Sequence, residues 1–275
     1  MSIDIEKTSE ALEALASWED GMEEVEKDVE LFRLRKVAPL YERRNVLIKD
    51  IPGFWSIVLN QHSDFANYVR ASDFKYIDAI KAIEIKWLCL DDSTVNPRNF
   101  ELTVEFNGID GDFEKQIVTK VFEIEHDVSK IRYREKRTEE DDALDEELGY
   151  LTSKPVDIKW PKSYDEINPD LITDKRSSVG KRNYRSGMKS FFGWFRWTGL
   201  KPGKEFPNGD GLANLFIEEL YPYCIKYYTD AQRDVADESE SDEEASDEPI
   251  QLDLSDKEES EDEDGVLRSE KRRKL

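Results

Sequence analysis

The fold is decided by residues 10–55, which read EALEALASWEDGMEEVEKDVELFRLRKVAPLYERRNVLIKDIPGFW. Apolar side chains return along its first half in alternating steps of three and four residues, which is the spacing of helices that pack along their length. One helix from Ala11 to Ile51 would be roughly 60 Å long, more than the diameter of a small domain. Its apolar stripe therefore needs a partner, and we expect the same helix of a second chain to provide it. The residues predicted to hold this homodimer are Leu15, Trp18, Met22, Val25, Val29, Phe32, Leu40 and Leu47.

Pro39 qualifies this prediction. Proline has no amide hydrogen and clashes with the preceding turn, so we expect the helix to bend there. The stripe is also weak just before Pro39, because Lys36 takes the position that follows Phe32. The alternative is two ordinary helices that break at Pro39 and fold onto one core. Pro52 and Gly53 are then predicted to end the helical stretch or to turn it sharply.

The composition limits the classes of function. Of the 275 residues, 38% are hydrophobic, and the formal net charge is -23. Residues 234–264 alone hold 17 acidic residues and one basic residue. Such a chain repels nucleic acid and anionic membranes and attracts basic proteins. We find neither a secretion signal nor an apolar stretch long enough to cross a bilayer, and expect no membrane contact. Cys89 and Cys224 lie in apolar runs, which indicates reduced, buried thiols of an intracellular protein.

The spacing of apolar residues changes after residue 80. Up to that point it remains helical, and His62 is expected to be a satisfied core histidine. From Ile83 the period is two, which is typical of a half-buried strand. Successive strands with short turns predict an antiparallel sheet with helices on one face, an α+β fold. The predicted strands are residues 83–89, 100–106, 117–125 and, at the edge, 156–160, with a hairpin connection at 108–112 and a long charged loop at 126–148.

The second half of the chain joins a basic stretch to an aromatic one. Residues 175–189 hold six lysines and arginines, and residues 191–197 hold five aromatic residues. This pairing fits either a base-stacking platform beside a basic patch or an aromatic core preceded by a solvated helix. The acidity of the whole chain favours the core. Residues 212–230 again have helical spacing, despite Pro222.

The C-terminal residues are predicted to form a tail. Apolar content falls sharply after Asp230, and acidic residues with serine and glycine cannot bury enough surface to offset chain entropy. We therefore expect three parts: a dimerisation helix at 1–55, an α+β domain at 56–230 and a disordered acidic tail at 231–275. The chain ends in a basic cluster of the composition that nuclear import receptors bind, although it also fits a merely charged end. This cluster is Lys271, Arg272, Arg273 and Lys274.

No motif in the sequence carries catalytic chemistry. The two histidines and two cysteines lack the spacing of a metal site. Glycine-rich nucleotide-binding loops and a G-x-S-x-G elbow are absent. We therefore expect no enzyme activity and no cofactor.

Several of these stretches together resemble the nucleosome assembly protein (NAP) family of histone chaperones, from about residue 10 to residue 228. They are the long N-terminal helix, the Ile51-Pro52-x-Phe54-Trp55 sequence that closes it and the Ser190-Phe191-Phe192-x-Trp194-Phe195 run. The last helix, with Glu218-Glu219-x-Tyr221-Pro222 and Tyr227-Tyr228, and the acidic tail complete the resemblance. Residues 63–68, 70–78 and 192–207 are similar to one fungal branch, which works with a histone H3 lysine acetyltransferase.

The resemblance implies a nuclear homodimer whose long helices pair antiparallel and whose α+β "earmuff" domains bind core histones, especially H3–H4, through acidic surfaces. It further implies a histone lysine acetyltransferase and a nuclear import receptor as partners, with DNA contacted only indirectly. The predicted histone-binding residues are Glu218, Glu219, Asp237, Glu238, Asp242, Glu243, Glu244, Glu258, Glu259, Glu261, Asp262, Glu263 and Asp264. Each of these carboxylates taken alone also fits ordinary solvated surface.

Two other functions remain open at this point. The first is a phosphatase-inhibiting or signalling scaffold of the SET type, which uses an acidic tail as a pseudo-substrate. The second is nucleic-acid binding through residues 175–189 and the aromatic residues that follow, which predicts a steep salt dependence of DNA binding.

Overall fold

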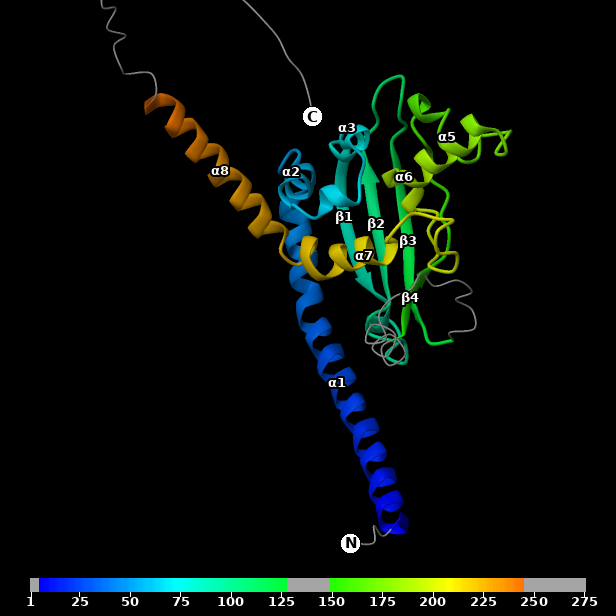
Figure 1. The fold of residues 1–275 in the computed structure, drawn as a ribbon. Helices are drawn as coiled ribbons and strands as arrows, with labels where there is room; N and C mark the ends of the chain where they lie inside the picture. Colours follow the sequence, from blue (N-terminus) through cyan, green and yellow to red (C-terminus); the bar gives the residue numbers. More distant parts are fainter. Residues whose placement is uncertain (1–4, 128–148, 245–275) are drawn as a thin grey trace, which may run out of the picture. The chain divides into compact units, whose positions relative to one another are not determined.

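The computed structural model describes residues 5–127 and 149–244, with side chains from 7–127 and 149–234 (Figure 1). The first element is α1 (Ile5–Ile48), a single helix that continues through Pro39. Two helices broken at Pro39, the alternative, are therefore wrong. Leu34 before the proline and Tyr41 after it pack against the rest of the chain, and this packing offsets the hydrogen bond that proline removes. As predicted, the helix ends before Pro52 and Gly53.

Short helices and a sheet follow α1. Gly53 has φ 69°, a left-handed conformation that favours glycine, and it lets the chain turn into α2. The described elements after α1 are α2 (Phe54–Gln61), η1 (Phe65–Asn67), η2 (Ala71–Asp73), α3 (Phe74–Ile77), β1 (Ile80–Trp87), η3 (Leu88–Leu90), β2 (Phe100–Phe106), β3 (Gln116–Glu125), β4 (Tyr150–Ser153), η5 (Lys162–Tyr164), α5 (Ser178–Met188), α6 (Phe191–Trp194), α7 (Gly209–Asn214), the π-helix η6 (Leu215–Leu220) and α8 (Cys224–Glu244).

The sheet is antiparallel throughout, in the order β1-β2-β3-β4. Its inward rows follow the period of two: Val104 pairs with Ile83 and Val118, and all three are buried. The predicted second strand is confirmed at both ends, and the third begins one residue earlier than predicted. The first strand begins at Ile80, three residues earlier than predicted. It ends at Trp87, because Cys89 belongs to the short helix η3.

The fourth strand was predicted in the wrong place. The strand that pairs with the end of β3 is Tyr150–Ser153, and residues 156–160 form no strand. The Gln116 side chain bonds to both main-chain groups of Lys159, and the Val156 amide donates to the Phe195 carbonyl at 2.9 Å. The hydrogen bonds of residues 156–160 are therefore made with partners other than a neighbouring strand. Ile158 is nevertheless buried, as a period of two predicts. Most of the predicted loop at 126–148 lies outside the described residues.

The helices α6 and α7 cross one face of the sheet (Figure 1). Aromatic side chains make up much of the buried core. Phe191, Phe192, Trp194 and Phe195 have no exposed surface. The indole of Trp194 donates to the carbonyl of Gly209 at 2.9 Å, which satisfies its buried N–H. The aromatic core is thereby confirmed, and these rings cannot act as a base-stacking platform. Cys89 and Cys224 are free and buried, as predicted.

The C-terminal helix extends further than predicted. α8 runs to Glu244, beyond the boundary placed at residue 230. Alanine, glutamine, arginine and glutamate all favour helix, and they are frequent in residues 231–244. The described residues up to Asp234 belong to one compact unit. The remainder of the predicted tail and the basic cluster at 271–274 lie outside the described residues.

Candidate acidic binding site

The π-helix Leu215–Leu220 carries Glu218 and Glu219, the two acidic residues before the tail that the family resemblance implied for histone binding. Its wide turn is seen in the bond from the Tyr221 amide to the Phe216 carbonyl, five residues back, at 3.0 Å. Leu215, Phe216 and Leu220 are buried, so Glu218 and Glu219 face outward. π-helices are rare and occur frequently at functional sites. The core thus anchors one side of the π-helix and presents two carboxylates on the other.

Glu218 borders two hollows. One, of about 460 Å³, includes Asp64, Tyr68 and Glu219 in its lining, and we call it the Tyr68 hollow. The other, of about 390 Å³, includes Tyr41 and residues of α1, and we call it the Tyr41 hollow. Asn214 and Glu218 line both. A ligand that reaches either hollow therefore meets the Glu218 carboxylate.

Three carboxylates, those of Asp64, Glu218 and Glu219, line the Tyr68 hollow. Burial, followed by the nearby Asp210 and Asp64 carboxylates, raises the pKa of the Tyr68 hydroxyl above its usual value. A hydrogen bond from His62 lowers the pKa of Glu219, which keeps that carboxylate ionised at neutral pH. These charges favour a cationic ligand over a neutral or anionic one.

The Tyr41 hollow lies where α1 joins the π-helix. The Arg44 guanidinium donates to the Tyr221 carbonyl at 2.6 Å and stacks over the rings of Tyr41 and Tyr221. Asn45 donates to the Tyr221 hydroxyl at 2.9 Å. The second half of α1 is therefore fixed against the end of the π-helix. Glu30 of α1 also lines this hollow, but its carboxylate is paired with Arg33 at 2.6 Å.

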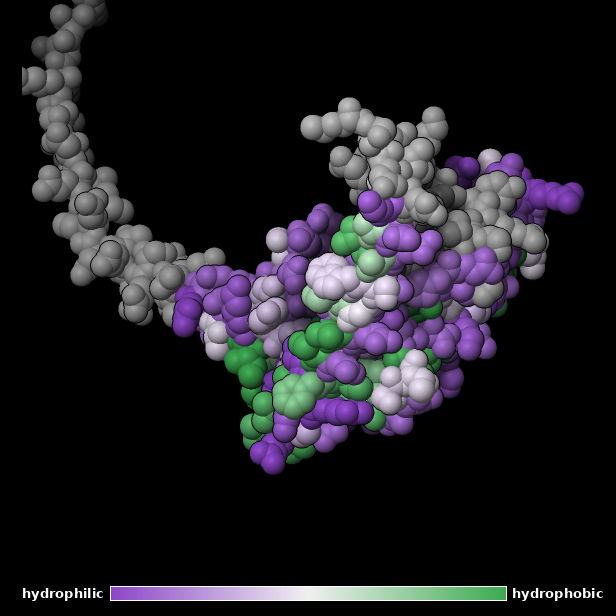
Figure 2. Space-filling view, turned by 90° about the horizontal axis from the view of Figure 1, so that it is seen from below, coloured by the Kyte–Doolittle hydropathy of each residue, from purple (hydrophilic) through white to green (hydrophobic). Residues whose placement is uncertain are grey.

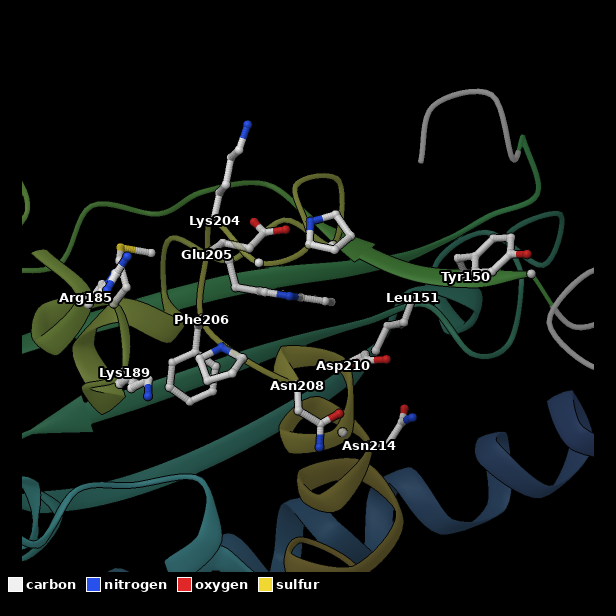
Figure 3. Close-up of a pocket in the computed structure, with 18 of the residues that line it drawn as sticks. Tyr150, Leu151, Arg185, Lys189, Lys204, Glu205, Phe206, Asn208, Asp210 and Asn214 are labelled. Carbon is white, nitrogen blue, oxygen red and sulfur yellow. The ribbon is translucent and has the colours of Figure 1, made fainter. Parts of the chain in front are cut away.

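A third hollow, of about 740 Å³, has a different character (Figure 3). It lies between α5 and the loop that leads to α7, and Arg185 of α5 and Lys189, the residue after α5, lie along it. The Glu205 carboxylate on its wall accepts hydrogen bonds from the amides of Thr198 and Lys201. The basic stretch thus forms a solvated helix, the second of the two arrangements that the sequence allowed. With the neighbouring rings buried, the nucleic-acid alternative loses its aromatic platform.

The other predicted site residues are distributed as follows. The apolar stripe of α1 is exposed, with Trp18 and Phe32 each 63% exposed. In the view from below, apolar side chains lie at the surface among hydrophilic ones (Figure 2). Asp237, Glu238, Asp242, Glu243 and Glu244 lie on α8, past the last described side chain. Outside the described residues altogether are Glu258, Glu259, Glu261, Asp262, Glu263, Asp264, Lys271, Arg272, Arg273 and Lys274.

Two buried charged residues were not predicted. The ammonium of Lys120, with no exposed surface, donates to the carbonyls of Lys154, Phe195 and Trp197 at 2.8–3.1 Å. Burial lowers the pKa of Lys120 to about 7. Asp73, equally buried, accepts hydrogen bonds from the Arg70 amide and from the hydroxyls of Tyr164 and Ser190. Lys120 lies between Val118 and Phe122 in the inward row of β3, so the period of two along this strand is the signal in the sequence for its burial.

The described part of the chain offers little for other chemistry. Across residues 5–127 and 149–244, no helix is long and apolar enough to span a membrane. In the same residues, histidine, cysteine, aspartate and glutamate side chains form no group of three suited to a metal ion.

Comparison with known proteins gives a consistent result. No family model matches the chain. The chain is 55% identical over 230 residues to vacuolar protein sorting-associated protein 75 (Vps75) of Saccharomyces cerevisiae, covering 84% of this chain and 81% of Vps75. A crystal structure of Vps75 superposes with a TM-score of 0.72, at 54% identity, over 82% of this chain and 99% of that one. A further crystal structure is described as the Vps75 histone chaperone. Protein SET of Drosophila melanogaster is 27% identical over 86% of this chain and 79% of SET.

The chain therefore belongs to the nucleosome assembly protein family of histone chaperones. The long N-terminal helix and the antiparallel sheet covered by helices are the fold of that family. Its similarity is greater to Vps75 than to SET.

Proposed function

We propose that the chain is a nuclear, homodimeric histone chaperone that binds H3–H4 through acidic surfaces, supports nucleosome assembly and escorts a histone lysine acetyltransferase. The proposal includes no catalytic step. The observation that carries it is the position of Glu218, an exposed carboxylate shared by two hollows on a chain of net charge -23. Membership of the histone chaperone family supports the same function.

In the proposed mechanism, carboxylates compete with DNA phosphates for the lysines and arginines of histones. The net charge attracts histones over about one Debye length, roughly 8 Å at physiological ionic strength. A single exposed ion pair contributes only about 0–1 kcal/mol, so affinity must come from many contacts made together. Shielding the histone charges prevents indiscriminate binding to DNA and allows transfer to DNA or to an acetyltransferase.

The dimer is proposed from the two properties of α1. First, its exposed apolar stripe would stay in water in a single chain, at a cost of about 25 cal/mol per Å². Second, residues 5–30 hold ten acidic and two basic residues, whereas residues 31–48 hold five basic and one acidic. Antiparallel pairing of two copies brings each acidic half against a basic half, whereas parallel pairing brings like charges together.

A fluorescence titration of labelled H3–H4 at physiological salt tests the function. The full chain and a shortened chain ending at Glu244 are compared. We expect both to bind with nanomolar affinity and the shortened chain to bind more weakly. Loss of all binding in the shortened chain would make residues 245–275 the binding element. If neither chain binds, the proposal is wrong.

The proposed acetyltransferase partner and the nuclear location have separate tests. A stable complex with a histone H3 lysine acetyltransferase should co-purify from fungal cells. Replacing Lys271, Arg272, Arg273 and Lys274 by alanine should move a fluorescently tagged chain from the nucleus to the cytoplasm. An unchanged distribution would assign import to another segment.

The similarity to SET supports a second candidate function, that of a phosphatase-inhibiting scaffold. A phosphatase assay with the full chain separates the two functions. Inhibition without H3–H4 binding would favour the scaffold.

A further inference from the structure

Glu218 and Glu219 are adjacent in the sequence but differ in their bonding. The Glu219 carboxylate is 2.9 Å from His62 Nε2 and accepts a hydrogen bond from the Tyr227 hydroxyl at 3.2 Å, through the same oxygen. Across residues 7–127 and 149–234, we find no hydrogen bond or ion pair to the Glu218 carboxylate. Glu219 is thus bonded within the chain, and Glu218 is available to a ligand.

The side chain of His62 is buried and oriented toward Glu219. The imidazole is 6% exposed and follows the last residue of α2. Its Nδ1 accepts the amide hydrogen of Asp64 at 3.2 Å, so the hydrogen of the neutral ring lies on Nε2 and is donated to Glu219. The ring also contacts that of Tyr227, with 4.8 Å between the centroids. Packing and two hydrogen bonds therefore leave His62 one orientation.

These contacts join three elements at the π-helix. His62 comes from the end of α2, Glu219 from the π-helix and Tyr227 from the first turns of α8. A π-helix accommodates one residue more than an α-helix over the same turn. If that residue were lost to α-helical geometry, the side chains on one side of it would rotate by about 100° relative to those on the other. Glu218 would then leave its place between the two hollows.

We infer that His62 is a positioning residue for histone binding: together with Tyr227 it holds Glu219, and through Glu219 it presents Glu218 as the carboxylate that meets cationic histone side chains. This inference rests on the proposed function and divides the two predicted histone-binding glutamates. Glu218 touches the histone, whereas Glu219 fixes the helix that carries Glu218.

A double-mutant cycle on the full-length chain tests this assignment. Affinity for labelled H3–H4 is measured for wild type, Glu218→Gln, His62→Leu and the double variant, with thermal unfolding and dimer mass recorded for each. We expect each single change to weaken binding about fivefold and the double change to weaken it no further, because His62 acts through Glu218. A role in fold stability alone would lower the unfolding temperature and leave affinity unchanged.

Three conservative variants sharpen the test. His62→Gln keeps an N–H donor directed at Glu219 and should restore affinity to within about twofold of wild type. Glu219→Gln keeps an acceptor for His62 and Tyr227 and should also change affinity less than about twofold. Tyr227→Phe removes only the hydroxyl, and should weaken binding about twofold in the wild-type background and not in Glu218→Gln. It carries the test if His62→Leu does not fold.

The outcomes separate the inference from the function on which it rests. If the wild-type chain does not bind H3–H4, the proposed function fails and this inference with it. If wild type binds but the effects of His62→Leu and Glu218→Gln on affinity add in the double variant, His62 is not a positioning residue. Where His62→Leu does not fold, the same conclusion follows if Tyr227→Phe weakens binding equally in the wild-type and Glu218→Gln backgrounds. Glu219→Gln as damaging as Glu218→Gln would make Glu219 a histone contact as well, which also overturns the inference.

Discussion

Large apolar side chains are exposed to solvent on the first half of α1 and buried in the α+β domain. Trp18 on α1 is 63% exposed, whereas Trp194 in the domain is completely buried. The second half of α1 belongs with the domain, because Leu34 and Ile48 are buried in the same core. The domain completes its core within one chain, and the exposed stripe of α1 needs a second one. The two regions should therefore respond differently to mutation, to dilution and to salt.

The largest expected effect is on the proposed pairing of α1. Val29→Asp places a charge twice in the dimer seam, where burying it unpaired is costly, and should weaken dimerisation roughly a thousandfold. Sedimentation of fluorescently labelled chain at nanomolar concentration measures this. The matched control is Lys27→Asp, which adds the same side chain on another face of the helix, at a position already exposed. A variant Val29→Asp that is still dimeric at nanomolar concentration would show that the stripe does not hold the dimer.

A core change on the other side of the same helix should behave differently. Leu34 has no exposed surface, so Leu34→Ala leaves a cavity and should lower the free energy of unfolding by about 3 kcal/mol. Urea unfolding at two protein concentrations measures the loss. The difference from wild type should be the same at both concentrations, with the dimer dissociation constant unchanged. A loss that depends on dilution would mean that Leu34 also serves the dimer interface.

The buried Lys120 predicts how the stability of the domain depends on pH. In the folded chain its pKa is about 7, below the usual value of 10.5, because burial disfavours the charge. Between these two values the unfolded chain binds more protons, so stability rises with pH from 7 upward and is lost as pH falls toward 7. Urea unfolding should show a gain of about 2 kcal/mol from pH 7 to pH 9 that is absent in Lys120→Met. Equal slopes for both proteins would refute this assignment.

The smallest effect should come from the charge halves of α1. If two copies pair antiparallel, acidic halves face basic halves, and raising salt from 50 to 300 mM should weaken the dimer about three- to fivefold. Parallel pairing places like charges together, so salt would then strengthen the dimer. Sedimentation across a salt series gives the sign of the effect directly.

Prediction from the sequence succeeded where a local repeat carries the information. The alternation of residues in β2 predicted which face of the strand is buried, and the helical period of α1 predicted its apolar stripe. It failed for the fourth strand, because Tyr150–Ser153 and residues 156–160 have similar local character and only long-range hydrogen bonds distinguish them. For the candidate site, the family resemblance pointed to Glu218 and Glu219, and their role in binding stays a prediction; their different bonding depends on contacts with distant residues such as His62.

By itself the sequence determined the α+β class, the long helix with its exposed stripe, the aromatic core and the acidic balance of the chain. These follow from periodicity, composition and charge, which are properties of neighbouring residues. Only the tertiary structure decided that His62, 157 residues from Glu219, would hold that carboxylate. It also decided that Lys120 would meet three carbonyl oxygens inside the core. Such contacts depend on which distant segments pack together, and the spacing of residues along one segment does not predict that packing.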